Sequence, residues 1–153
     1  MARLQLALNV SDLDSAIDFY TKLFDTPPAK IRPGYANFTI ADPPLKLVLI
    51  AGGGAPGSLN HLGVEVENRL EVASAHRRLV RHHLATTVEN EVSCCHAVQD
   101  KVWVDSPDGS AWEIYTVLAD IDMPSHEPGA TPPTDGPCCV SGPDLAVANE
   151  PGP

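Results

Sequence analysis

The stretch LQLALNV (residues 4–10) is matched by the stretch NHLGVEV (residues 60–66), and this repeat decides the fold. In both stretches apolar side chains alternate with polar or small ones, which is the period of a half-buried β-strand. Each strand runs into a helical pattern, and in the first copy Ser11 or Asp12 is the expected N-terminal cap. The repeat therefore indicates two copies of one structural module.

The first copy reads as one strand, one helix and three further strands. Its helix has an apolar face made of Leu13, Ala16, Ile17, Tyr20 and Phe24. The strands expected after this helix cover residues 29–32, 35–41 and 45–51. A glycine-rich segment, residues 52–57, then predicts a flexible hinge between the two copies.

The second copy repeats this order of elements. A helix is expected over residues 68–83, with Leu70, Ala73, Arg77 and Val80 at helical spacing. The strands expected after it cover residues 86–92, 101–105 and 111–117. We therefore predict an α+β fold in which two paired βαβββ modules, about residues 2–51 and 58–118, form a curved mixed sheet around a metal cavity.

The composition limits the classes of function. The chain has 153 residues, of which 43% are hydrophobic, and this favours one domain with an apolar core. A net charge of −10 argues against nucleic acid and anionic membrane surfaces as partners, because both attract basic patches. No apolar run approaches the roughly 18 residues of a membrane span, and the N-terminus enters a strand with no signal-peptide core. These features predict a cytoplasmic location.

The last part of the chain has a different composition. Residues 121–153 hold 8 of the 15 prolines and five acidic residues, with no lysine or arginine. Such a segment buries too little apolar surface to offset the entropy lost on ordering. We therefore expect a domain over residues 1–120 and a disordered, proline-rich acidic tail over residues 121–153.

Three side chains form a candidate metal site. Gln5 and His61 occupy the same place in the two copies, and Glu113 lies in the last strand of the second copy. With pseudo-twofold packing they face one concavity, while the first copy offers only Leu47 or Leu49 at the position of Glu113. An amide oxygen, an imidazole and a carboxylate leave coordination positions open, which favours non-haem Fe(II) over zinc. The alternative is structural: a hydrogen-bonded strand histidine, a glutamine at a sheet edge and an outward-facing glutamate.

The four cysteines form two adjacent pairs, Cys94-Cys95 and Cys138-Cys139. Adjacent cysteines rarely bond each other, and free thiols are the default in a reducing cytosol. We expect residues 93–96 to form a loop, which lets Cys94 and Cys95 reach one atom. Two thiolates chelate soft centres such as trivalent arsenic or antimony, mercury and cuprous copper. The alternative is that the pairs are incidental.

Several stretches resemble the vicinal oxygen chelate superfamily, and more narrowly its organoarsenical C–As lyases. They are LQLALNVSDLDSAIDFYTKLF, PGYANFTIADPPLKLVL, LNHLGVEV, CCHAVQDKVWVDSPDG and WEIYTVLAD, and they span roughly residues 2–120. The most specific feature is the combination of CC followed by QDKVWV, with NHLGVEV upstream. The superfamily also includes glyoxalases, extradiol dioxygenases and antibiotic-resistance proteins.

The resemblance implies cleavage of the carbon–arsenic bond of trivalent organoarsenicals, dependent on Fe(II) and dioxygen. Its substrates would be methylarsenite and reduced aromatic arsenicals, with arsenite as the inorganic product. Matched residue by residue, the resemblance implies that Gln5, His61 and Glu113 bind iron. It also implies that Cys94 and Cys95 bind arsenic.

Further residues have expected roles around this site. Asn60 and Tyr115 are expected to orient the metal ligands, and Tyr115 shares a strand face with Glu113. Lys101 could pair with a carboxylate, although a solvated lysine is favoured. The pair Cys138-Cys139 is expected either to capture substrate on a tether or to lie in an idle tail.

Two other functions stay open at this point. A thiol-based binding protein of this fold would sequester arsenicals without chemistry. An extradiol dioxygenase would normally carry a histidine in place of Gln5, and it would have no use for Cys94-Cys95. Product that forms only with Fe(II) and air discriminates the lyase from the binding protein. A homodimer is also considered, because this fold often forms dimers.

Overall fold

The computed structural model describes residues 1–94 and 97–120, with Cys94 described by its main chain alone. The first half of that part contains β1 (Arg3–Val10), α1 (Leu13–Phe24), β2 (Lys30–Arg32), β3 (Tyr35–Ile40) and β4 (Leu45–Ala51). The second half contains β5 (Leu59–Glu65), α2 (Arg69–Arg81), β6 (Thr87–Cys94), β7 (Ala97–Asp105) and β8 (Ala111–Asp120). The predicted tail, including Cys138 and Cys139, lies outside the described residues.

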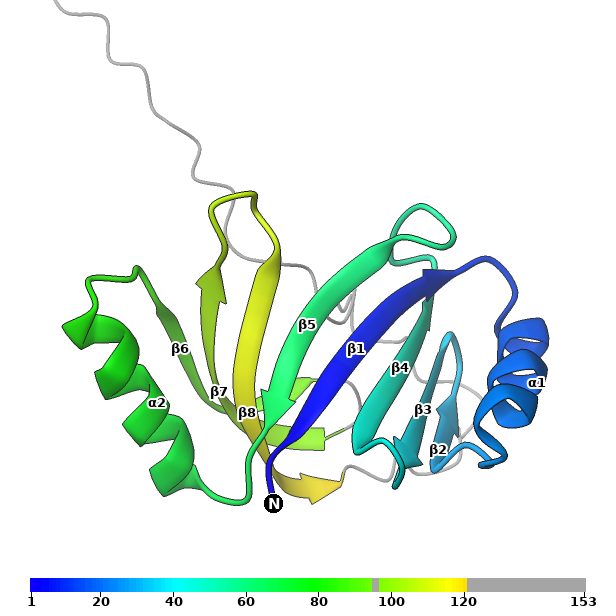
Figure 1. Ribbon diagram of the computed structural model, residues 1–153, viewed down its shortest axis with the longest axis horizontal. Helices are drawn as coiled ribbons and strands as arrows, with labels where there is room; N and C mark the ends of the chain where they lie inside the picture. Colours follow the sequence, from blue (N-terminus) through cyan, green and yellow to red (C-terminus); the bar gives the residue numbers. More distant parts are fainter. Residues whose placement is uncertain (95–96, 121–153) are drawn as a thin grey trace, which may run out of the picture.

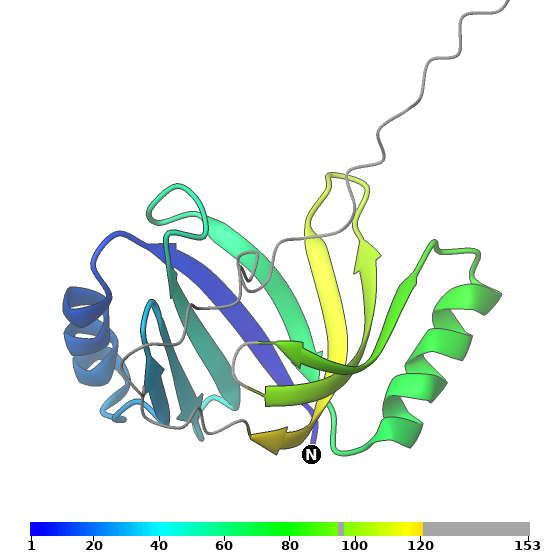
Figure 2. The same cartoon turned by 180° about the vertical axis from the view of Figure 1, so that it is seen from behind.

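The strands form one mixed sheet in the order β2-β3-β4-β1-β5-β8-β7-β6. The two repeated stretches are its central pair, because β1 lies antiparallel to β5, while β4 is parallel to β1 and β8 is parallel to β5. The sheet curls into a half-barrel, with α1 and α2 on its outer side at opposite ends (Figures 1 and 2). The predicted fold of two βαβββ modules around a curved mixed sheet is confirmed.

The outer face of the first module packs against α1. Asp12 caps this helix, accepting a hydrogen bond from the main-chain nitrogen of Ser15 at 2.8 Å. The helix lays its predicted apolar face on a fully buried cluster in the sheet, which consists of Ala36, Phe38, Ile40, Leu47 and Leu49. Burial of this kind is the main favourable contribution to folding. Because neighbouring side chains of a strand point to opposite faces, the alternate residues of these strands line the inner face of the sheet.

The apolar face of α2 differs from the predicted one. The buried residues of this helix are Val72 and Ala75, whereas Leu70 is 79% exposed and Val80 is 51% exposed. The predicted stripe through Leu70, Ala73, Arg77 and Val80 was therefore wrong by part of a turn. The helix is rich in arginine and weakly apolar, so its periodicity alone did not indicate which face packs on β7 and β8.

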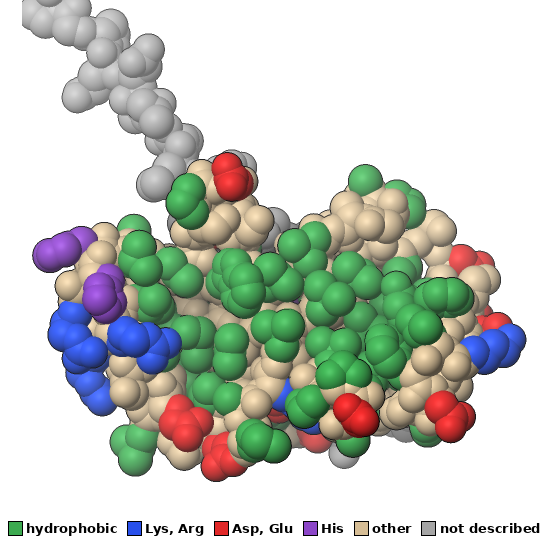
Figure 3. All heavy atoms as spheres, viewed as in Figure 1, with side chains coloured by type: hydrophobic (Ala, Val, Ile, Leu, Met, Phe, Trp, Pro, Cys, Tyr) green, Lys and Arg blue, Asp and Glu red, His purple; other side chains and the backbone are tan. Residues whose placement is uncertain are grey.

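The outer face between the two helices is apolar. Figure 3 shows hydrophobic side chains gathered there, over the central strands. Leu4 of β1 is 46% exposed, and Leu6, Leu62 and Val64 are half-buried. No helix in the described part of the chain is both long and apolar enough to cross a bilayer.

Ser93 and Cys94 lie in a strand and not in the predicted loop. Strand β6 continues to Cys94 and β7 begins at Ala97, and the main chains of these two residues pair. Strand β7 therefore begins four residues earlier than the predicted strand at 101–105. Cys95 and His96 lie outside the described residues.

Candidate metal centre

The structure brings Gln5, His61 and Glu113 together on the inner face of the sheet. They lie on the neighbouring strands β1, β5 and β8, and the register aligns Gln5 with Gly63 and Gly63 with Glu113. A Cβ atom on Gly63 would lie 3.0 Å from Cγ of Glu113 and 3.3 Å from Nε2 of Gln5. Because Gly63 has no side chain, the side chains on either side of it can meet.

The three end groups have the spacing of metal ligands. Nε2 of Gln5 lies 3.0 Å from Nε2 of His61 and donates to Oε1 of Glu113 at 2.6 Å, and the imidazole and carboxylate atoms are 3.3 Å apart. Ligand atoms that bind one metal at about 2.1 Å and at right angles are about 3 Å apart. All three residues are at most 4% exposed. The donor set therefore fits one face of a coordination polyhedron.

The glutamine amide has a second partner on β8. The hydroxyl of Tyr115 donates a hydrogen bond to Oε1 of Gln5, while Nε2 of Gln5 faces the other two ligands. Burial raises the pKa of the Tyr115 hydroxyl, which stays protonated. A cation would need Oε1 in the place of Nε2, and a half-turn of the amide exchanges the two atoms. The hydroxyl can then accept from Nε2, so Tyr115 can hold the amide in either orientation.

A chain of hydrogen bonds fixes the proton on His61. The hydroxyl of Ser58 donates to the carbonyl of Ala55 and accepts from Nδ2 of Asn9 at 2.9 Å. Oδ1 of Asn9 then accepts from Nδ2 of Asn60 at 2.9 Å, and Oδ1 of Asn60 lies 2.7 Å from Nδ1 of His61. Because an amide oxygen can only accept, Nδ1 carries the proton. Nε2 keeps its lone pair and faces Gln5 and Glu113, as a metal ligand must.

The glycine-rich segment before β5 packs against this chain. A Cβ atom on Gly53 would lie 2.8 Å from Oδ1 of Asn9 and 3.0 Å from Nδ2 of Asn60, and one on Gly54 would lie 2.7 Å from Nδ2 of Asn9. The sequence indicated a hinge here, but these glycines also let the backbone approach buried amides. Asn9, which is 3% exposed, was missed as a site residue.

Lys101 is buried, so the expectation of a solvated lysine was wrong. It is 1% exposed, and its Nζ donates to Oε2 of Glu113 at 2.9 Å. The ammonium also lies 5.3 Å from the ring centroid of Trp103 and 5.9 Å from that of Tyr115. Burial alone would raise the pKa of Glu113, but the positive charge of Lys101 and the hydrogen bond from its ammonium lower the pKa overall. Glu113 is therefore a carboxylate with Oε1 directed at the other two ligands.

The counterpart of Glu113 in the first module is Val48. Ala7 aligns with Val48 as Gly63 aligns with Glu113, so the predicted matches, Leu47 and Leu49, were wrong by one residue. A shift of one residue moves a strand side chain to the opposite face, and these leucines pack beneath α1. Among residues 1–94 and 97–120, no three His, Cys, Asp or Glu side chains cluster as a metal site. The centre has three donors only when the amide of Gln5 is included.

Fold and site together define a class of protein. A half-barrel of two βαβββ modules with metal-capable side chains converging on its inner face is the architecture of the vicinal oxygen chelate proteins. The chain belongs to the Glyoxalase/Bleomycin resistance protein/Dioxygenase superfamily, whose family model matches residues 3–114.

Relatives within this family have several names. The chain is 60% identical over 123 residues to a trivalent organoarsenical cleaving enzyme of Thermomonospora curvata, a match that covers 80% of this chain and 82% of the relative. It is 53% identical over 142 residues to the cadmium-induced protein CadI of Mycobacterium bovis, covering 91% and 93% of the two chains. The structure of an extradiol ring-cleaving dioxygenase from B. fuscum matches with a TM-score of 0.57 at 17% identity, over 78% of this chain and 34% of that chain.

Proposed function

We propose that this protein cleaves the carbon–arsenic bond of trivalent organoarsenicals to give arsenite, with Fe(II) as cofactor and dioxygen as co-substrate. The observation that carries this proposal is the buried convergence of Gln5, His61 and Glu113 at ligand-to-ligand distances of 2.6–3.3 Å. The name of the relative at 60% identity supports the substrate class.

Each ligand contributes a different property. His61 supplies a neutral nitrogen whose lone pair is fixed by Asn60, and Glu113 supplies a negative charge that is held in place by Lys101. Gln5 supplies an amide oxygen that is weakly donating and held by Tyr115. The chemistry that Fe(II) provides in such a ligand set is the binding and activation of dioxygen at positions that the protein leaves open.

The arsenic is assigned to Cys94 and Cys95, whose thiols lie outside the described side chains. A trivalent organoarsenical with two hydroxyl groups can exchange them for two thiols, which releases two molecules of water and forms two As–S bonds. The reacting carbon then stays attached to a fixed arsenic atom. Holding the substrate and the metal centre in one cavity lowers the entropic part of the barrier.

The test is an assay of arsenic speciation. The protein is reconstituted with Fe(II) without oxygen, and methylarsenite is then added with and without air. We expect arsenite only when both iron and air are present. Methylarsenite that is bound tightly but unchanged in every condition would overturn the proposal, and it would make this a sequestering protein. In a parallel assay with a catechol and air, formation of ring-cleaved product, together with no arsenite from methylarsenite, would favour an extradiol dioxygenase.

Four further proposals rest on sequence. The domain is proposed to end near residue 120, which limited proteolysis tests directly. The cytoplasmic location is tested by fractionation of cells, and the homodimer by sedimentation of the full chain. For Cys138 and Cys139, removal of residues 121–153 should raise the apparent KM if these thiols capture substrate, whereas an unchanged KM would mean an idle tail.

A further inference from the structure

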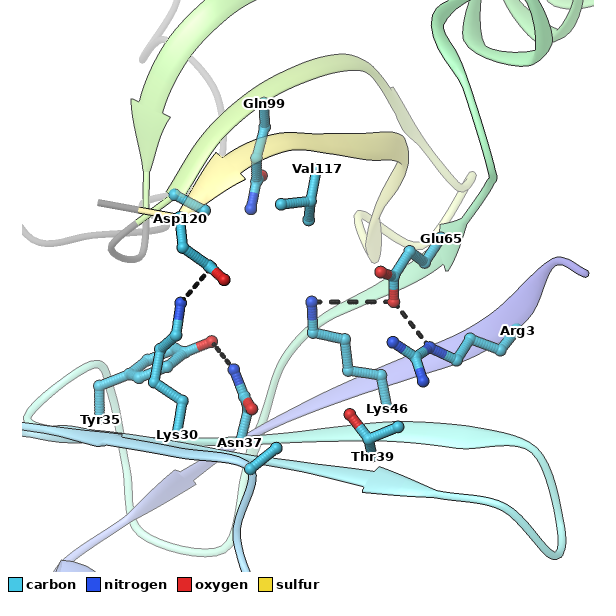
Figure 4. A pocket seen from close by; sticks show the side chains of 12 residues that line it. Arg3, Lys30, Tyr35, Asn37, Thr39, Lys46, Glu65, Gln99, Val117 and Asp120 are labelled. Carbon is cyan, nitrogen blue, oxygen red and sulfur yellow. Dashed lines mark hydrogen bonds and ion pairs between the residues drawn. The ribbon is translucent and has the colours of Figure 1, made fainter. Parts of the chain in front are cut away.

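The inner face of the half-barrel contains a polar cavity, which we call the inner pocket. It has a volume of about 220 Å³. Figure 4 shows side chains from both modules pointing into it. Its walls are Arg3, Ala29, Lys30, Tyr35, Asn37, Thr39, Lys46, Glu65, Ala97, Gln99, Val117 and Asp120. None of the three candidate metal ligands lines it.

The inner pocket lies between the candidate metal centre and the adjoining ends of β6 and β7, at Cys94 and Ala97. On one side, its wall residue Ala97 pairs through its main chain with Cys94 and with Asp120. On the other side, the ammonium of Lys46 lies 5.2 Å from the ring centroid of Tyr115, whose hydroxyl donates to Gln5. With arsenic bound at Cys94, as proposed above, its organic group would therefore have this cavity as its neighbour.

The charges around the inner pocket largely compensate each other. Glu65 lies 2.7 Å from Nε of Arg3 and 3.8 Å from Nζ of Lys46, and Asp120 forms an ion pair with Lys30. Three cationic and two anionic side chains line the cavity, and each carboxylate is close to a cation. Such a lining suits a neutral polar group better than a strongly charged ligand.

One polar atom in the wall is unsatisfied. Gln99 is 6% exposed, and its Oε1 is buried without a hydrogen-bond partner in the described part of the chain. In Figure 4 the amide of Gln99 points from β7 into the inner pocket with its nitrogen foremost, and a half-turn of the amide would present Oε1 to the pocket instead. A buried acceptor without a donor costs free energy, so a ligand with an O–H or N–H group at this place would gain from meeting it.

The size of the cavity indicates how large that group is. A methyl group occupies about the volume of one water molecule, about 30 Å³, whereas cavities on the order of 150 Å³ accept benzene. At about 220 Å³ the inner pocket has room for a substituted ring. The phenol ring of Tyr35 and the side chain of Val117 provide the less polar parts of the wall, against which the faces of such a ring can pack.

We infer that the inner pocket receives the organic group of the arsenical, and that Gln99 selects aromatic groups that carry a hydroxyl or amino hydrogen. This inference rests on the proposed function and specifies its substrate class. Gln99 acts as an acceptor that is satisfied only when such a group is bound. Thus the chain should discriminate between rings of equal size by their hydrogen-bond donors.

The experiment compares three trivalent arsenicals, with methyl, phenyl and 4-aminophenyl groups. The kcat/KM for arsenite release and the Kd without oxygen are measured for the wild type and for Gln99→Met, which keeps length but removes the acceptor. We expect the wild type to favour 4-aminophenyl over phenyl by about tenfold, the worth of one hydrogen bond to a buried acceptor. In Gln99→Met this ratio should fall to about one.

Two further outcomes keep the inference separate from the proposed function. A ratio that is the same in wild type and Gln99→Met overturns the selection by Gln99. If no arsenical is cleaved by the wild type, the proposed function fails, while the ratio of Kd values still tests the pocket. Should Gln99→Met not fold, Val117→Phe fills the cavity instead. It should weaken binding of both aryl compounds relative to methylarsenite, and equal weakening of all three would contradict the inference.

Discussion

The two modules share one backbone but carry opposite chemistry at the same positions of their inner faces. In the first module these positions hold a buried apolar cluster, made of Ala7, Tyr35, Val48 and Ile50. By the register of the strands, the second module holds Gly63, Lys101, Glu113 and Tyr115 at the matching places. At these positions the first module supplies a packed wall and the second supplies charged, hydrogen-bonded side chains, to which the first module adds only Gln5.

The comparison shows how a duplicated fold can be specialised without a change of topology. In the apolar cluster each side chain contributes mainly by excluding water, so its contribution depends little on any single neighbour. In the polar cluster each group needs another, since Glu113 would be a buried charge without Lys101, and Gln5 has Tyr115 as its partner. Replacing residues of one module by their counterparts in the other should separate these two kinds of contribution.

The largest effect is expected from Glu113→Val, which gives the second module the residue of the first. The centre loses its only carboxylate, so the Fe(II) affinity should fall by more than about 100-fold. Loss of a residue that only supports a metal ligand costs up to about 100-fold, and loss of the ligand itself should cost more. The change also leaves the Lys101 ammonium buried without this carboxylate, which should cost about 3–5 kcal/mol of stability. Metal analysis and thermal unfolding measure the two losses.

A double variant separates them. Adding Lys101→Met to Glu113→Val removes the buried charge and should restore most of the stability, but not the iron. Full iron binding by either variant would contradict the assignment of Glu113 as a ligand.

The next effect is expected from Gly63→Ala, whose counterpart in the first module is Ala7. The new Cβ atom would lie 3.0 Å from Cγ of Glu113, so the ligands on either side must move apart. Fe(II) affinity should fall by about 10- to 100-fold, as when the support of a metal ligand is lost. The matched control is Ala7→Gly, which should cost about 0.5–1 kcal/mol of stability and leave the Fe(II) affinity unchanged. Equal iron affinities in the two variants would show that the close approach at Gly63 is unimportant.

A smaller effect is expected from Asn60→Leu, which removes the acceptor for Nδ1 of His61. The imidazole then loses the contact that fixes its tautomer, and Fe(II) affinity should fall by about tenfold. Nitrogen NMR of the metal-free protein should show Nδ1 protonated in the wild type and a mixture of tautomers in the variant. Asn60→Asp keeps an oxygen acceptor and should keep the wild-type tautomer. If Asn60→Leu also keeps it, the hydrogen-bond chain has no such role.

The smallest effect on iron is expected from Val48→Ala in the apolar cluster. Val48 is 3% exposed, so the cavity left by its methyl groups should cost about 1–3 kcal/mol of stability. The iron affinity and the arsenite release should match those of the wild type. A loss of iron binding in this variant would mean that the apolar cluster of the first module also supports the metal centre.

The sequence was sufficient to predict the repeat, the order of the strands within each module and the three residues that converge. These features follow from period-2 alternation and from equivalent positions in two copies, which are local properties of the chain. The strand Leu45–Ala51 was predicted at its observed bounds, and Asp12 was one of the two predicted caps. Gly63 carried a signal that was not used, because a glycine inside a strand often marks a close approach.

What the sequence did not show depends on partners that are distant along the chain. A lysine in a strand usually lies in water, and the burial of Lys101 is understood only once Glu113 is placed beside it. Asn9 was missed because its partners Ser58 and Asn60 come from another strand and the loop before it. Val48 was missed because the register between the parallel strands β1 and β4 is set by tertiary packing, and an error of one residue selects the wrong face.

The most direct test of the metal centre is a calorimetric titration of Fe(II), without oxygen, into three proteins side by side. They are the wild type, Val48→Ala, and the double variant Glu113→Val with Lys101→Met. We expect a single iron site of equal affinity in the first two proteins and no iron binding in the third. Iron bound by all three proteins with the same stoichiometry and affinity would contradict the assignment, because Glu113 and the side chains around it would then not be the metal centre.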